Sequence, residues 1–172
     1  MYAYFEVRPG QASSQTRLPL NFTLVLDKSG SMAGDRMIQL KTAVHTLIDQ
    51  LQPDDHIAII AFNATPQTVV EATTAADKQM LHDAVDKLKA TGLTKMAPAM
   101  ERGLQEVMKH VGPQRASRLI ILTDGQTKGE DACAAQAMQA GQMGVPIVAL
   151  GLGADWNEDL LLDLAQKGAA PG

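Results

Sequence analysis

Three oxygen-bearing side chains stand close together in the segment 21–32, NFTLVLDKSGSM. Asp27, Ser29 and Ser31 alternate as D-x-S-x-S directly after the apolar run Phe22–Leu26. Such a run predicts a buried strand that ends in a polar loop. A carboxylate and two hydroxyls at alternating positions can point at one spot, and oxygen ligands suit a hard divalent cation. The alternative is an ordinary loop whose side chains cap the amides of the next helix.

Two positions much further along the chain extend this pattern. Thr94 lies in the polar stretch 90–95, and Asp124 ends a second apolar run, Leu119–Thr123. With these residues, the segment from about residue 18 to residue 164 resembles a von Willebrand factor type A (VWA) domain that carries a metal-ion-dependent adhesion site. In that family the ion is held by D-x-S-x-S, a distant Thr and a distant Asp. The resemblance implies these metal ligands: Asp27, Ser29, Ser31, Thr94 and Asp124.

The resemblance also implies a cofactor and a partner. The ion would be Mg²⁺, or Mn²⁺ or Ca²⁺, and an Asp or Glu side chain of a protein ligand would complete its coordination. Lys28 lies inside the D-x-S-x-S loop, and Lys95 follows Thr94 where the family more often has Asp or Asn. Both lysines are either solvated or add positive potential that favours an anionic partner. We therefore expect a metal-dependent module for protein–protein interaction, in adhesion or as a scaffold.

Two other functions are alternatives to this one. Haloacid-dehalogenase phosphatases place Asp-x-Asp-x-Thr after a first strand, and their second Asp is the general acid. Ser29 occupies that position here and cannot serve as the acid. The other alternative is a structural scaffold whose loop binds no ion. We expect no enzymatic activity.

Composition narrows the class of protein further. The 172 residues suit one domain, and 45% apolar with 20% charged residues predict a folded globule. A net charge of −4 without basic clusters argues against nucleic acid. The sequence contains no apolar run long enough to span a membrane and no signal peptide at its start, so a cytoplasmic location is expected. The single cysteine, Cys133, fits a helix core better than a catalytic role.

Alternating strand and helix patterns must position the ligands. They predict an α/β fold with a doubly wound, mostly parallel sheet, one antiparallel edge strand and helices on both faces. Ligands bind such sheets beyond the carboxyl ends of the strands, where Asp27 and Asp124 both lie. The expected strands are 22–26, 56–62, 67–71 (the antiparallel edge), 118–123 and 145–152, and the expected helices are 35–51, one after 74–77, one from Pro98, 129–143 and 157–165.

Several expectations concern local detail. Thr74–Asp77 resembles a capping box, and Val111 ends the buried stripe of the helix from Pro98. The methionines near the site, Met32, Met37, Met96 and Met100, are expected to pack in the core. The histidines, His45, His56, His82 and His110, have no zinc-like spacing and are expected at surfaces or strand ends.

The domain organisation is expected to be simple. Residues 1–17 would form a strand, Tyr2–Val7, and a linker, and 18–172 the VWA domain, shortened at its C-terminal end relative to the family. That shortening would expose the strand 145–152 as an edge that can pair with another chain. A larger multidomain parent protein is also compatible with the sequence.

Overall fold

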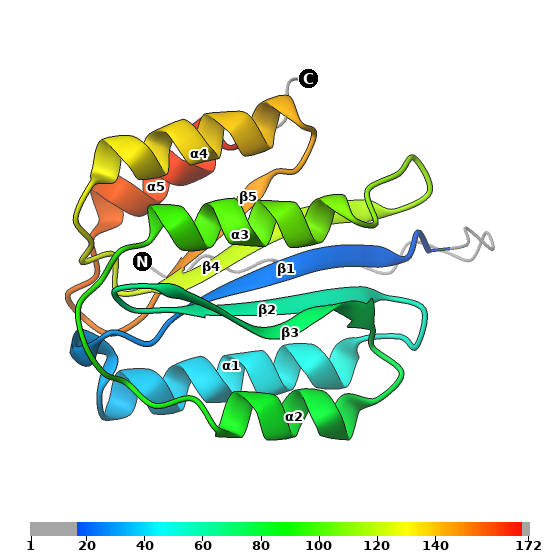
Figure 1. Cartoon of the computed structure of the whole chain (residues 1–172), viewed down its shortest axis with the longest axis horizontal. Helices are drawn as coiled ribbons and strands as arrows, with labels where there is room; N and C mark the ends of the chain where they lie inside the picture. Colours follow the sequence, from blue (N-terminus) through cyan, green and yellow to red (C-terminus); the bar gives the residue numbers. More distant parts are fainter. Residues whose placement is uncertain (1–16, 170–172) are drawn as a thin grey trace, which may run out of the picture.

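The fold is built around one five-stranded sheet, as a computed structural model of residues 17–169 shows (Figure 1). The strand order is β3-β2-β1-β4-β5, and every pair is parallel except β2 and β3. The predicted class and the antiparallel edge are thus confirmed, whereas the predicted strand Tyr2–Val7 lies outside the described residues. The strands are β1 (Leu20–Asp27), β2 (His56–Phe62), β3 (Pro66–Thr74), β4 (Ala116–Thr123) and β5 (Ile147–Gly151).

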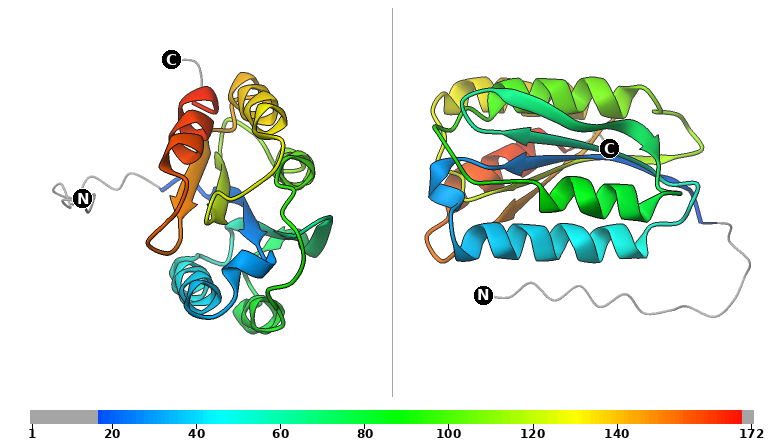
Figure 2. Two further views of the ribbon diagram at one scale, coloured as in Figure 1. Left: turned by 90° about the vertical axis from the view of Figure 1, so that its left-hand side faces the viewer. Right: turned by 60° about the horizontal axis from the view of Figure 1, so that its bottom comes forward.

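Helices cover both faces of the sheet. α1 and α2 lie on one face, and α3, α4 and α5 lie on the other (Figures 1 and 2). A short 3-10 turn, η1, connects β1 to α1. The helical elements are η1 (Gly30–Met32), α1 (Asp35–Gln50), α2 (Lys78–Asp86), α3 (Ala97–Met108), α4 (Glu130–Gln142) and α5 (Glu158–Lys167). No helix within residues 17–169 combines the length and the apolar character needed to cross a bilayer.

Two aliphatic cores sandwich the central strand. β1 is buried from Asn21 to Asp27, and its side chains alternate between the core beneath α1 and α2 and the core beneath α3 to α5. A strand with a helix layer on each side must be apolar on both faces, which explains its nearly continuous hydrophobic run. The four methionines predicted to pack inside are all buried: Met32, Met37, Met96 and Met100.

The two borders of the sheet differ. β5 forms one border, as expected, and its Val148 and Leu150 are exposed. β3 forms the other border and contains an irregularity opposite Ile57–Ile59. At that irregularity the carboxylate of Glu106 on α3 accepts a 2.9 Å hydrogen bond from the backbone N–H of Ala72. Burial alone would raise the pKa of Glu106, but the hydrogen bonds from Lys109 and Ala72 outweigh it and the pKa is lowered.

The opposite end of the sheet from the D-x-S-x-S loop is held by one buried carboxylate. Asp55 accepts hydrogen bonds from the backbone N–H groups of Leu20 (2.7 Å) and Gln52 (2.8 Å). Its two oxygens also accept bonds from both terminal nitrogens of Arg17, at 3.0 and 2.8 Å. Burial opposes ionisation, yet these four donors prevail and lower the pKa of Asp55. The carboxylate thereby ties the start of β1 to the turn before β2.

Two local predictions were wrong. Thr74 does not cap α2, because it is the last residue of β3 and pairs with His56. Asp77 is the cap instead, and its side chain accepts a 3.0 Å bond from the N–H of Met80. Val111 is 38% exposed, because α3 ends at Met108 and residues beyond it leave the helical face.

Candidate metal centre

The predicted ligands converge at the carboxyl edge of the sheet. β1 and β4 are adjacent parallel strands, so Asp27 at the end of β1 and Asp124 just after β4 emerge on the same side. The left panel of Figure 2 views this edge, where η1 and the loops before α3 and after β4 lie together. The topology therefore brings together residues from three remote segments of the chain, as the sequence predicted.

Asp27 is a buried carboxylate between neutral donors. Its Oδ1 accepts a 2.8 Å hydrogen bond from the N–H of Ser29, and its Oδ2 accepts a 2.6 Å bond from the hydroxyl of Thr123. The side chain is fully buried. Burial raises its pKa, and the nearby charge of Asp124 raises it further against the effect of the hydrogen bonds. Within residues 17–169, no cationic side chain forms an ion pair with this carboxylate.

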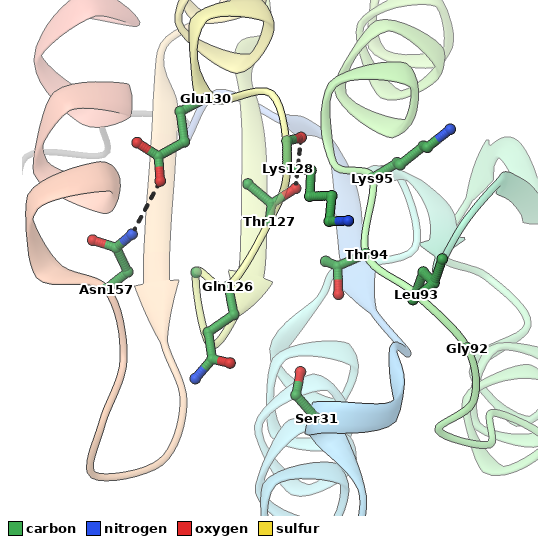
Figure 3. Close-up of a pocket in the computed structure, with 11 residues that line it drawn as sticks. Ser31, Gly92, Leu93, Thr94, Lys95, Gln126, Thr127, Lys128, Glu130 and Asn157 are labelled. Atoms are coloured by element: carbon green, nitrogen blue, oxygen red, sulfur yellow. Dashed lines mark hydrogen bonds between the residues drawn. The ribbon is translucent and has the colours of Figure 1, made fainter.

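The serine loop is fixed to the loop that carries Thr94. The hydroxyls of Ser29 and Ser31 lie 3.1 Å apart, and the N–H of Gly30 donates a 2.9 Å bond to the carbonyl of Gly92. A Cβ at Gly30 would lie 3.2 Å from that same carbonyl, so glycine allows the close approach. Figure 3 shows the oxygens of Ser31 and Thr94 pointing toward each other across a cavity of about 470 Å³.

Asp124 carries a partner that the sequence analysis missed. Its Oδ1 accepts a bond from the N–H of Gln126 at 3.0 Å, and its Oδ2 accepts one from Arg36 at 3.1 Å. The same nitrogen of Arg36 donates to the carbonyl of Ser31 at 3.0 Å. Arg36 therefore connects the serine loop to Asp124 from the first turn of α1. The position of Arg36 in the predicted helix is the same as that of an arginine that faces solvent, so the sequence gave no signal for this contact.

The donor set fits a hard divalent cation. It consists of two carboxylates and three hydroxyls, all oxygen atoms, at one edge. Mg²⁺ and Mn²⁺ take such ligands and keep several waters. No group of three or more His, Cys, Asp or Glu side chains suited to a metal forms anywhere in residues 17–169.

The two lysines singled out in the sequence flank the site on separate surfaces. Lys28 directly follows Asp27 and reaches toward β3, where its amine donates a 3.1 Å hydrogen bond to the side chain of Gln67. Lys95 lines the same cavity as Ser31 and Thr94. Both side chains are accessible, which is compatible with either of the two roles considered for them.

Four histidines form two pairs that the sequence did not predict. Nδ1 of His45 on α1 lies 2.6 Å from Nδ1 of His82 on α2, and each outer ring nitrogen contacts a carboxylate at 2.9 Å, on Asp86 and Asp49 respectively. The rings of His56 and His110 are also in contact, with centroids 4.1 Å apart and the ring planes tilted by 44°. All four histidines are partly exposed, and His56 is the first residue of β2, in line with the expectation of surface or strand-end positions; the pairing itself comes from helix packing, which joins residues 37 positions apart.

Cys133 has no reactive surroundings. It is buried in α4, and burial raises the pKa of its thiol to about 11. A thiol that stays protonated and inaccessible is a packing residue, in agreement with the sequence analysis.

Fold and site together define a class of protein: an α/β domain with a mostly parallel sheet and oxygen-bearing side chains at its carboxyl edge. The sequence profile of the von Willebrand factor type A domain matches residues 21–171. The chain therefore belongs to the VWA family, whose members typically serve as protein-interaction modules.

Individual relatives agree with this assignment. The chain is 36% identical over 151 residues to the uncharacterized protein sll0103 of Synechocystis, and 30% identical over 162 residues to inter-alpha-trypsin inhibitor heavy chain H2 of Mus musculus. Both alignments cover 87% of this chain, but they cover only 36% and 17% of the relatives. The crystal structure of manganese-loaded TRAP protein of Plasmodium vivax shares the fold, with a TM-score of 0.73 and 18% identity. The match covers 87% of this chain and 63% of that one.

Proposed function

We propose that this domain holds a divalent cation of the Mg²⁺ type and uses it to bind an acidic side chain of a partner protein. Asp27, Ser29, Ser31, Thr94 and Asp124 would hold the ion, directly or through water. The observation that carries the proposal is Asp27, a fully buried carboxylate with a raised pKa and, within residues 17–169, only neutral hydrogen-bond donors against it. Charge of this kind is costly to bury unless a cation compensates it.

The ligands from this chain would leave a coordination position of the ion for a partner. Two carboxylates would balance a dication, Arg36 beside Asp124 adds one more positive charge, and hydroxyls are weak ligands, so an additional anionic ligand would bind favourably. The manganese-loaded TRAP structure supports the choice of ion class, since it has the same fold and contains a divalent metal. When bound, the ion supplies an open coordination position that accepts a carboxylate oxygen. Arg36 keeps Asp124 oriented toward the serine loop, and the Gly30–Gly92 contact keeps Thr94 opposite Ser31.

Thermal unfolding with and without metal tests the proposal. A ligand that binds only the folded state at a hundredfold excess over its Kd stabilises by about 2.7 kcal/mol. For a domain of this size the melting temperature then rises by about 5–10 °C. We expect this rise with Mg²⁺ or Mn²⁺ relative to chelator in the wild type, and no rise in Asp27→Asn.

A second prediction for Asp27→Asn concerns stability without metal. Since ionised Asp27 is disfavoured by burial, its neutral isostere should be at least as stable as the wild type in chelator. The matched control is Asp54→Asn, which removes an exposed carboxylate at the other end of the sheet and should keep the full metal response. An identical metal response in wild type and Asp27→Asn would refute the proposed site.

A further inference from the structure

The rim around the candidate ion site is divided into a basic side and an acidic side. On the basic side, a groove of about 380 Å³ lies between the start of β3 and the end of α2. Three lysines line it, Lys28, Lys87 and Lys89, and no Asp or Glu does. Lys28 follows Asp27 directly in the chain, so this groove begins next to the site.

The groove is held in place by the loops of the site itself. The N–H of Lys28 donates to the carbonyl of Phe62 at 2.8 Å, and the N–H of Thr91 donates to the carbonyl of Lys28, also at 2.8 Å. Thr91 lines the groove, and the next residue, Gly92, lines the central cavity with Thr94. The groove and the central cavity are therefore neighbours separated by one short loop.

The groove lysines have no carboxylate partners in residues 17–169. The ion pairs there use other cations, namely Arg17, Arg36, His45, His82, Lys109 and Lys167. Among the residues that the structure describes, the amine of Lys28 hydrogen-bonds only to the neutral side chain of Gln67. Their positive charge is thus available to a ligand, on a chain whose net charge is −4.

The opposite side of the rim carries negative charge. A cavity of about 400 Å³ between α4 and α5 is lined by Glu130, Asp131, Asp159 and Asp163, together with one lysine, Lys167, which is paired with Asp163 at 2.7 Å. Glu130 also lines the central cavity, and Figure 3 shows it with Asn157 on one side of that cavity while Lys95 lies on the other. An anionic partner is repelled from this side and attracted to the other.

From this division of charge we infer that the partner is an acidic segment with at least two carboxylates: one at the ion and a second, a few residues along the chain, in the Lys28–Lys87–Lys89 groove. The inference rests on the proposed function, because it assumes that the first carboxylate binds the ion. It adds the direction of the bound segment, from the ion toward α2 and away from α5. The second contact also makes binding more dependent on ionic strength than coordination alone.

Two fluorescent pentapeptides test the inference by anisotropy in Mg²⁺. One contains five glutamates, and the other contains a single central glutamate among glutamines. We expect the wild type to bind penta-glutamate about tenfold more tightly than the single-glutamate peptide at low salt. Lys87→Gln/Lys89→Gln should reduce that advantage about fivefold and leave the single-glutamate peptide unaffected. The control, Lys41→Gln/Lys78→Gln, removes the same charge elsewhere on α1 and α2 and should behave as wild type.

The outcomes separate this inference from the proposed function. Equal affinity of both peptides for the wild type, or equal effects of the two double variants, overturns the groove but not the ion site. Binding of both peptides unchanged in Asp27→Asn overturns the ion-bound carboxylate, and with it the segment direction inferred here. If neither peptide binds the wild type at millimolar concentration, both ideas are overturned.

Discussion

Replacing Asp55 by alanine should show how much one buried carboxylate contributes to the fold. The substitution removes the acceptor for the N–H groups of Leu20 and Gln52 and for the guanidinium of Arg17. These bonds join the start of β1 to the turn before β2, far from the candidate ion site. The effect should therefore appear in stability and not in metal binding.

The expected loss of unfolding free energy in Asp55→Ala follows from the groups that lose their hydrogen-bond acceptor. Each of the two backbone donors left without a partner costs about 1–3 kcal/mol, at the lower end here because both lie near solvent. Arg17 is 47% exposed, so its ion pair adds about 0.2–1 kcal/mol. The total is about 3 kcal/mol, which lowers the melting temperature by about 6–12 °C.

Urea unfolding at neutral pH is the assay, with Arg17→Gln as the matched variant. Arg17→Gln should cost no more than about 1 kcal/mol, because the backbone donors keep their acceptor. If Arg17→Gln proves as destabilising as Asp55→Ala, the backbone bonds contribute little and the reasoning is refuted.

The pH dependence of the same pair gives an independent check. The pKa of Asp55 is lowered in the folded protein, so its contribution is complete above the unfolded-state pKa of about 3.9. It is lost as the pH falls through the folded-state pKa. The stability difference between wild type and Asp55→Ala should therefore be constant near neutrality and shrink in acid.

Three further predictions concern the helices. Gly103→Ala should destabilise by about 1–2 kcal/mol in urea unfolding despite the better helix propensity of alanine, because its Cβ would lie 2.8 Å from Val25 and 2.9 Å from Leu119; a stabilised variant would contradict this. His45→Gln and His82→Gln should be non-additive by about 0.5–1.5 kcal/mol in a double-mutant cycle, and additivity would mean that their contact contributes nothing. Cys133 should resist a thiol reagent at pH 8 until urea unfolds the protein; rapid labelling of the native state would show that it is accessible.

The sequence was most informative where strand order alone decides the outcome. Asp27 and Asp124 each follow an apolar run, and parallel strands end at one edge, so their convergence could be predicted without coordinates. Thr94 follows a helix rather than a strand, and its place came from the family resemblance. The structure explains it by the bond between Gly30 and Gly92, which no sequence pattern encodes.

The contacts that were missed depend on how elements pack in three dimensions. His45 meets His82 because α1 and α2 pack with these residues facing each other, and Arg36 reaches Asp124 because the first turn of α1 lies beside the loop after β4. Residue spacing gives the face of one helix but not the rotation of its neighbour. Thr74 was predicted at the start of α2 but belongs to β3. Its pairing with β2 outweighs the local sequence signal for a helix cap.

The bulge of β3 that Glu106 contacts has a consequence for self-association. An irregular border whose free amide is already occupied is a poor template for an incoming strand, and Pro66 further interrupts it. Ile147–Gly151 at the far border pairs with β4 in continuous register, and only at its first residue does an outward amide find a partner within residues 17–169, where the N–H of Ile147 donates a 3.2 Å bond to the carbonyl of Gly168. If two copies extended their sheets into one, they would join through the outer edge of β5 and be related by a twofold axis.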